Sequence, residues 1–209
     1  PIAKHGNRAL SSKTGAAEVL TQLGVNLDCK RELVQSSMNE AGICFLMAPR
    51  HHTAMRHVAD TRIQLATRTI FNLLGPIANP ADVTRQLVGV FSQDWVEPVA
   101  KVLKSLGSER AWVVHGSDGL DEITTTGKTK VASLEDGAVT IFEIHPSEAG
   151  IKLAKPEQLV GGEPEENANA LLSIFNGERN AYRDVVVLNS AACLIIAGKA
   201  KNLTEGASI

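Results

Sequence analysis

The chain has 209 residues, of which 44% are hydrophobic, and its 21 lysine and arginine residues nearly balance its 23 aspartate and glutamate residues, giving a formal net charge of −2. This composition is typical of a globular chain with a sizeable core, and the three distant cysteines, Cys29, Cys44 and Cys193, exclude a small disulfide-stapled protein and favour a reducing, cytoplasmic compartment. The near-neutral charge argues against a nucleic-acid partner, and the most apolar stretch, residues 185–198, is too short to cross a membrane.

Local patterns predict alternating strands and helices in the first part of the chain. Apolar residues at helical spacing, preceded by a capping residue and followed by glycine, indicate a helix, whereas a short all-apolar run indicates a buried strand. The predicted elements are a strand ending at Ile2-Ala3, a helix over residues 14–23 capped by Thr14, a helix over 29–40 capped by Asp28, a strand over 43–47, one helix or two short helices over 52–66, and a loop over 72–80.

The remaining sequence again predicts alternating strands and helices, followed by a hairpin and two further helices. It predicts a strand over residues 86–91, a helix over 95–106, a strand over 110–114, a hairpin over 131–144 that turns at Glu135-Asp136-Gly137, and helices over 165–175 and 184–197. Strands that alternate with helices form parallel sheets. We therefore predict an α/β fold in which a mainly parallel sheet is flanked by helices and carries an appended antiparallel hairpin.

A basic segment near the start of the chain has the composition of a phosphate site. Lys4-His5-Gly6-Asn7-Arg8 and Ser11-Ser12-Lys13 combine cationic side chains, hydroxyl groups and a glycine between a predicted strand and a predicted helix. Backbone N–H groups at the start of a helix favour anions, and lysine and arginine add full charges. The alternative is a solvated basic loop in which Ser12 or Thr14 only caps the helix.

An acidic segment follows the strand predicted to end at Val114. It contains Asp118-Gly119 and the adjacent carboxylates of Asp121 and Glu122. Open α/β sheets bind ligands beyond the carboxyl ends of their strands, and Mg²⁺ typically joins one or two carboxylates to substrate phosphates. The pair therefore suggests a Mg²⁺ site, with an acidic surface turn as the alternative.

Imidazole and guanidinium groups are dense between positions 50 and 62. Arg50-His51-His52 is followed by Arg56, His57 and Arg62, without a cysteine or acidic residue at the spacing of a zinc site. We therefore expect packing or ligand-lining roles for this segment. Arg62 has the planar, bidentate geometry that suits a carboxylate ligand, although most arginines simply lie at the surface.

Four groups of residues, in order along the chain, resemble anthranilate phosphoribosyltransferase. They are Lys4-His5-Gly6-Asn7-Arg8 with Ser11-Ser12, then Ala48-Pro49-Arg50-His51-His52, then residues 68–76 with Asn79-Pro80, and last Val114-His115-Gly116 with residues 118–122. The resemblance covers essentially all 209 residues and implies an α/β phosphoribosyltransferase domain of the type shared with nucleoside phosphorylases. The family's N-terminal helical domain, its glycine-rich diphosphate loop and its C-terminal helical end have no counterpart here, so we expect an incomplete domain.

The resemblance implies transfer of the 5-phosphoribosyl group from 5-phospho-α-D-ribose 1-diphosphate (PRPP) to the amine of anthranilate, with release of diphosphate, in tryptophan biosynthesis. It also implies a homodimer in the full-length enzyme. It assigns Mg²⁺ to Asp121 and Glu122, and anthranilate to Asn7, His52, Arg62, Gly75 and Pro76, with Arg62 as the partner of the carboxylate. It assigns PRPP to Lys4, His5, Gly6, Asn7, Arg8, Ala9, Leu10, Ser11, Ser12 and Ala16, the last of which stands where the family often has serine. No general base is assigned, since a neutral aryl amine is already nucleophilic.

Two alternatives remain open at this point. A pyrimidine nucleoside phosphorylase shares the fold and also acts at an anomeric carbon, but Arg62 and residues 72–76 speak against it. A non-catalytic relative that binds nucleic acid conflicts with the charge of −2 and with the Asp121-Glu122 pair. Because only part of a diphosphate site is present, we expect a protein made strictly as residues 1–209 to be inactive and poorly soluble.

Overall fold

A computed structural model describes residues 1–8, 14–58, 61, 64–65, 67 and 69–209 of the chain. The chain divides into two compact units, the first formed by Pro1–Asp82 with Gly161–Ser173 and the second by Val83–Val160 with Ile174–Ile209. Each unit is described by itself. None of the helices in the described ranges combines the length and the apolar character that a membrane span requires.

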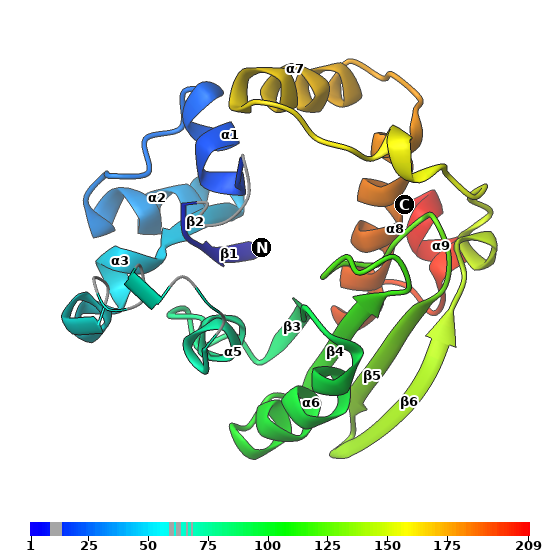
Figure 1. Ribbon diagram of the computed structural model, residues 1–209, viewed down its shortest axis with the longest axis horizontal. Coiled ribbons are helices and arrows are strands. Elements are labelled where there is room, and N and C mark those ends of the chain that lie inside the picture. The colour runs from blue at the N-terminus through cyan, green and yellow to red at the C-terminus, as the bar shows by residue number, and fades with distance from the viewer. Residues whose placement is uncertain (9–13, 59–60, 62–63, 66, 68) are drawn as a thin grey trace. The chain divides into compact units, whose positions relative to one another are not determined.

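The first unit is built on one pair of parallel strands. Its elements are β1 (Ile2–Gly6), α1 (Ala16–Gln22), α2 (Arg31–Ala41), β2 (Ile43–Met47), α3 (Ala48–His51), the 3-10 helix η1 (Thr53–Val58), α5 (Phe71–Ile77) and α7 (Pro164–Phe175) up to Ser173. β1 and β2 pair from Ile2 opposite Ile43 to Gly6 opposite Met47, and α1 and α2 form the crossover that a parallel pair needs (Figure 1). Ala17, Leu27 and Met47 form its buried centre.

The starts of α1 and α2 differ from the prediction. α1 is capped by Gly15 rather than Thr14, whose hydroxyl instead donates a 2.8 Å hydrogen bond to the carbonyl of Gly162. α2 begins after Lys30 rather than after Asp28. Both predicted caps were wrong, and in the fold both side chains contact residues far away in the sequence: Thr14 contacts Gly162, and Asp28 contacts Arg8 and Arg50.

Residues 72–80 are largely helical, so the predicted loop was also wrong. α5 covers Phe71–Ile77 and includes Pro76 in its last turn. Proline is unfavourable there because it lacks the N–H that would bond to the carbonyl four residues earlier, but the helix ends one residue later, at Ile77. Of the helices predicted over residues 52–66, the structure shows the 3-10 helix η1 at Thr53–Val58, while residues 59–60, 62–63 and 66 lie outside the described ranges.

The second unit contains a four-stranded mixed sheet. Its elements are β3 (Arg85–Gly89), η2 (Gln93–Trp95), α6 (Val96–Ser105), β4 (Arg110–Gly116), β5 (Thr129–Glu135), β6 (Ala138–Ile144), η3 (Pro146–Ala149), η4 (Pro156–Gln158), α8 (Ala181–Ile196) and α9 (Leu203–Ser208). The strand order is β3-β4-β5-β6, with β3 and β4 parallel and the other two pairs antiparallel. The structure thus confirms an α/β fold with parallel strands and an appended hairpin.

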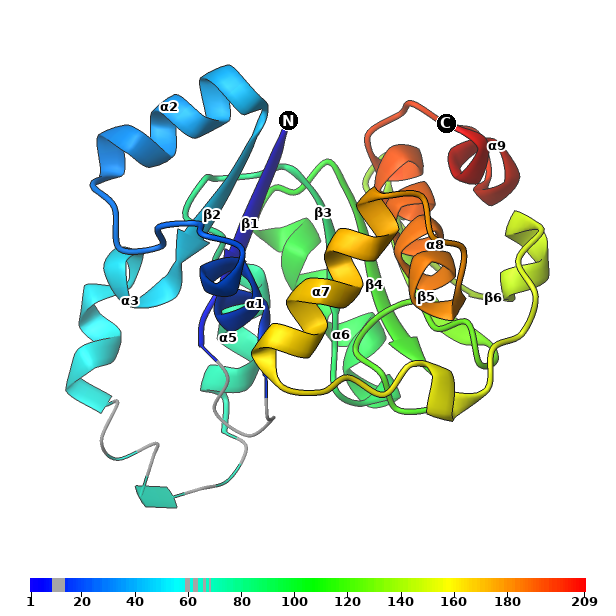
Figure 2. The same ribbon diagram turned by 90° about the horizontal axis from the view of Figure 1, so that it is seen from above.

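Helices α6 and α8 cover opposite faces of this sheet (Figure 1). On one face, Trp112 and Val114 of β4 pack in a buried cluster with Leu188 of α8, which runs beside β4 (Figure 2). On the other face lies α6, whose Val96 and Leu103 are fully buried. Burial of each such side chain stabilises the fold by roughly 1.5–3 kcal/mol, so these two layers are what holds the sheet in place.

The predicted hairpin turn is confirmed, whereas the last helix, α9, was not predicted. Asp136 and Gly137 turn the hairpin with positive φ angles of 50° and 72°, the conformation of a type I′ turn. α9 was not predicted, although Asn202 caps it by accepting a 2.9 Å hydrogen bond from the N–H of Glu205. A capping residue followed three positions later by glutamate is the signal that could have revealed it.

The contact between α8 and α9 generates a stability prediction. A Cβ atom on Gly206 would lie 2.8 Å from the Cα of Ala191, in the backbone of α8. We expect Gly206→Ala to lower the free energy of unfolding by about 1–3 kcal/mol, because neither helix can yield without losing core packing. Ser208→Ala, at an exposed position of the same helix, should change it by less than about 0.5 kcal/mol. Urea unfolding measures both, and equal stability of the two variants would contradict the close packing.

Candidate active site

The segment expected to bind PRPP begins inside a strand, not after one. Lys4, His5 and Gly6 are the last residues of β1, and Asn7 and Arg8 follow it. Neighbouring side chains of a strand point to opposite faces, and here Lys4 is exposed whereas His5 is half-buried. Ala16 is the exposed first residue of α1, and residues 9–12 lie outside the described ranges.

His5, expected at the PRPP site, contacts two residues expected at the anthranilate site. Its Nε2 lies 3.1 Å from Nε2 of His52, within hydrogen-bond distance, and its ring packs edge-on against that of His52. Burial and the neighbouring His52 lower the pKa of His5, against a backbone hydrogen bond to Gly75 that raises it. The fold thus brings His5, His52 and Gly75 together.

The other residues expected to bind anthranilate are less closely tied to this group. Pro76 follows Gly75 in the last turn of α5, and Asn79 just beyond the helix donates a 3.0 Å hydrogen bond to the carbonyl of Ala3 in β1. Asn7 is exposed and its Oδ1 accepts a hydrogen bond from the N–H of Arg8. Arg62 lies outside the described residues.

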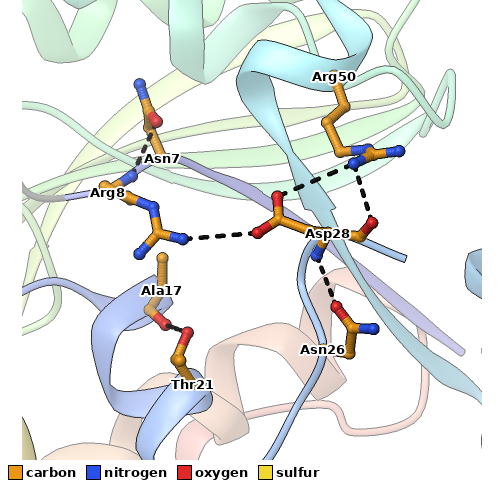
Figure 3. Close-up of polar contacts among 7 residues, drawn as sticks. All are labelled: Asn7, Arg8, Ala17, Thr21, Asn26, Asp28 and Arg50. Carbon is orange, nitrogen blue, oxygen red and sulfur yellow. Dashed lines mark hydrogen bonds and ion pairs between the residues drawn. The ribbon is translucent and has the colours of Figure 1, made fainter. Parts of the chain in front are cut away.

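Arg8 and Arg50 both point toward Asp28 (Figure 3). Arg8 Nη2 lies 3.8 Å from Oδ2 of Asp28, and Arg50 Nη1 lies 3.9 Å from its Oδ1 and donates a 3.0 Å hydrogen bond to its carbonyl. These side chains are largely exposed, so each ion pair contributes only about 0–1 kcal/mol. A pair this weak leaves Arg8 able to exchange Asp28 for a phosphate group.

A cavity of about 210 Å³ lies beside Arg50 in the first unit. Its apolar lining is formed by Leu27, Val34, Phe45 and Met47, and its polar lining by Cys29, Arg31, Arg50 and His51. Burial lowers the pKa of His51, and the charge of Arg31 lowers it further. Near neutral pH the positive charge of this cavity therefore comes from the two arginines.

The two carboxylates expected to hold Mg²⁺ lie in the second unit, on the connection from β4 to β5. We call this connection, residues 117–128, the acidic loop. Asp121 and Glu122 are exposed on it, whereas Ile123 directly after them is fully buried. A Cβ atom on Gly89 would come within 1.5 Å of the Asp121 carbonyl oxygen, so only glycine fits there. The loop therefore folds back over the carboxyl end of β3, where open α/β sheets bind ligands.

Asp118 holds the acidic loop together from within. Its Oδ2 accepts hydrogen bonds of 2.6 Å from the hydroxyls of both Thr124 and Thr126, and its Oδ1 accepts one of 3.2 Å from the N–H of Leu120. Burial raises the pKa of Asp118, but these hydrogen bonds outweigh burial and hold its pKa below the usual value. The carboxylate is ionised at neutral pH, where it is the stronger acceptor.

Helix α8 reaches the same loop through two residues for which the sequence predicted no role. Asn189 donates a 2.8 Å hydrogen bond to the carbonyl of Ile123 and accepts one of 3.0 Å from its N–H. Burial, and then the charge of Glu122, raise the pKa of Tyr182, which lies two helical turns before Asn189. Asn189 is the one amide side chain in the apolar stretch 185–198, which is the signal that could have identified it.

The donor set of the acidic loop fits Mg²⁺. Within the described ranges, no three His, Cys, Asp or Glu side chains gather closely enough to hold a metal ion by themselves. Asp121 and Glu122 offer two adjacent carboxylates on a well-anchored loop. Two oxygen donors suit an ion that keeps several waters and completes its shell with substrate phosphates, and they do not suit a metal enclosed by protein ligands alone.

The chain is similar to a known protein family throughout its length. The model of the "Glycosyl transferase family, a/b domain" matches residues 1–209. The chain is 63% identical over 206 residues to an anthranilate phosphoribosyltransferase of Azospirillum brasilense, covering 99% of this chain and 58% of that relative. The chain thus spans about three fifths of the length of the curated relatives that it matches.

Two solved structures extend the agreement to the fold. Anthranilate phosphoribosyltransferase from Thermus thermophilus matches 99% of this chain over 61% of its own, with a TM-score of 0.91 and 43% identity. The Saccharomyces cerevisiae enzyme in complex with PRPP and Mg matches 99% of this chain over 58% of its own, with a TM-score of 0.87 and 28% identity. These matches confirm the resemblance to anthranilate phosphoribosyltransferase. The chain belongs to the glycosyl transferase family, to whose a/b domain all of its residues correspond.

Proposed function

We propose that this protein transfers the 5-phosphoribosyl group from PRPP to the amine of anthranilate, releasing diphosphate and forming N-(5-phosphoribosyl)anthranilate. The observation that carries the proposal is the 63% identity, across 99% of this chain, to a relative of that name. The yeast relative was solved in complex with PRPP and Mg, which supports the same donor and the same ion here.

The proposed reaction requires groups that bind phosphates and a metal ion, and the chain has side chains suited to both. Breaking the bond at ribose C1 leaves negative charge on the departing diphosphate, and Mg²⁺, when bound, would neutralise that charge. Asp121 and Glu122 would hold the ion. Lys4, Arg8 and the segment through Ser12 would hold the phosphoribosyl donor, with Ala16 at the start of α1 beside them, because exposed cations and backbone N–H groups favour its phosphates.

The acceptor site would be formed by the group around His52. His52, Gly75 and Pro76 would line the path of the aromatic ring, and Asn7 and Arg62 would bind anthranilate, with Arg62 paired to its carboxylate. Burial and His52 keep the pKa of His5 low, so the His5 imidazole carries little positive charge at neutral pH. An aryl amine is nucleophilic when neutral, and positioning it can supply much of the rate.

The proposal extends to the setting of the enzyme. We place it in tryptophan biosynthesis, in the cytoplasm, as a homodimer whose chain includes the sequence that the relatives have beyond the matched region. The 209 residues would then be part of the α/β phosphoribosyltransferase domain. Neither a pyrimidine nucleoside phosphorylase nor a nucleic-acid-binding relative is favoured by any contact described above.

The activity is tested on a chain of the relatives' full length that contains these residues. We expect the fluorescence of anthranilate to fall only when PRPP and Mg²⁺ are both present, with one diphosphate released per anthranilate consumed. Replacing the substrates by thymidine and inorganic phosphate tests the phosphorylase. Phosphorolysis of thymidine without consumption of anthranilate would overturn the proposal.

The first functional prediction concerns the carboxylate pair. Asp121→Asn combined with Glu122→Gln removes both charges that would hold the metal ion, so turnover should fall by about two orders of magnitude or more and require more Mg²⁺ for half its maximum. Asp136→Asn combined with Glu157→Gln removes two exposed carboxylates of the same unit and should leave both quantities unchanged. An unchanged Mg²⁺ response in the first variant would exclude the metal role.

The second functional prediction concerns Arg62. Arg62→Lys keeps the charge but loses the bidentate fork, so the KM for anthranilate should rise about tenfold or more, equivalent to about 1.5–3 kcal/mol, while the KM for PRPP changes little. Arg179→Lys, at an exposed position, is the matched control. Steady-state kinetics with each substrate varied in turn measure the difference. Equal effects on both substrates would show that Arg62 does not bind anthranilate.

A further inference from the structure

Asp118 lies three positions before the first proposed metal ligand, yet its own carboxylate is engaged elsewhere. Both of its oxygens accept hydrogen bonds inside the acidic loop, from two threonine hydroxyls and from the N–H of Leu120. Thr124, one of the two donors, is fully buried. Asp118 itself is exposed, and its carboxylate is bound to the loop, in part through this buried threonine.

The contacts of Asp118 close a ring around the residues that carry the metal ligands. Asp118 precedes them and Thr124 follows them, and the 2.6 Å hydrogen bond between these two side chains joins the ends of the segment. The N–H of Leu120, inside the segment, bonds to the same carboxylate. A short segment tied at both ends and in the middle has few conformations left to it.

Two neighbouring elements hold the same segment from outside. The end of β3 presses on the Asp121 carbonyl through Gly89, and Asn189 of α8 bonds to both backbone groups of Ile123. The backbone is thus held at Asp121 itself and at Ile123, directly after Glu122, while the side chains of Asp121 and Glu122 are exposed. These backbone contacts fix where the two residues stand along the loop.

We propose that Asp118 is a positioning residue for the metal ion: by accepting hydrogen bonds from Thr124 and Thr126, it sets the spacing at which Asp121 and Glu122 present their carboxylates. This inference rests on the proposed function, in which those two residues hold Mg²⁺. Mg²⁺ demands near-ideal octahedral geometry, so small displacements of its ligands reduce affinity. Groups that orient metal ligands typically alter metal affinity 10- to 100-fold when they are removed.

The test measures metal binding directly, with Mn²⁺ as the probe and without turnover. The electron paramagnetic resonance signal of free Mn²⁺ is titrated with full-length enzyme in the presence of inorganic diphosphate. Asp118→Asn keeps the shape of the side chain but loses the charged acceptor, and Thr124→Val loses one donor. Both should weaken Mn²⁺ binding by about tenfold or more, while Thr124→Ser, which restores the hydroxyl, should bind within about twofold of the unaltered enzyme.

Two further measurements separate positioning from general stability. The KM for anthranilate should change by less than about twofold in Asp118→Asn, because none of the residues proposed to bind anthranilate belongs to the acidic loop. Asp136→Asn, which removes an exposed carboxylate from a turn in the same unit, should leave Mn²⁺ binding and melting temperature unchanged. Thr126→Val provides a second route to the same ring should Asp118→Asn fail to fold, and it should also weaken Mn²⁺ binding.

The possible failures can be told apart. If the Asp121→Asn and Glu122→Gln double variant loses Mn²⁺ binding but Asp118→Asn and Thr126→Val bind it normally, Asp118 has no positioning role and the proposed metal ligands stand. A lower melting temperature with unchanged Mn²⁺ affinity would likewise reduce Asp118 to a structural residue. If the double variant itself binds Mn²⁺ normally, the metal assignment fails, and the inference fails with it.

Discussion

The second unit depends on the closeness of two backbones, one at the end of β3 and one in the acidic loop. Gly89 lies so near the Asp121 carbonyl that no side chain fits between them. Because β3 and β4 are parallel neighbours, the chain leaving β4 must cross the end of β3 to make this contact. The crossing brings Asp121 and Glu122 to the carboxyl ends of the strands and buries Ile123 beneath them. Exposed acids therefore stand on a rigid, buried base.

Helices and strands with a clear local sequence pattern could be predicted, whereas those that depend on their place in the fold could not. Helix α6 was predicted because its buried residues, Val96, Val99 and Leu103, recur at helical spacing. Helix α5 was predicted as a loop because Gly75 and Pro76 are turn residues, yet the helix includes both of them in its last turn and ends at Ile77. Short α9 lacks the length over which apolar periodicity becomes visible.

The residues of the candidate site fall into the same two groups, those with a sequence pattern and those brought there by the fold. Lys4, His52, Asp121 and Glu122 could be named from the sequence because their types suit phosphate, aromatic and metal ligands and because they fall in recognisable motifs. The residue that clamps the acidic loop from α8 could not, since Asn189 is 66 positions from Ile123 and only the topology brings them together. A motif identifies the groups that meet a ligand, but the groups that orient them are set by tertiary contacts.

Helix α8 shows why the core and the proposed metal site cannot be separated. Leu188 and Ala191 belong to the buried cluster against the sheet, and Asn189, between them in sequence, bonds to Ile123 beside Glu122. Hydrogen bonds weaken steeply as their geometry departs from the optimum, so Asn189 can clamp the loop only while α8 is seated on the sheet. Gly206 of α9 in turn packs so closely against Ala191 that a Cβ atom would not fit between them. The packing of α9 against α8 thus contributes, through Asn189 and Ile123, to the position of Glu122.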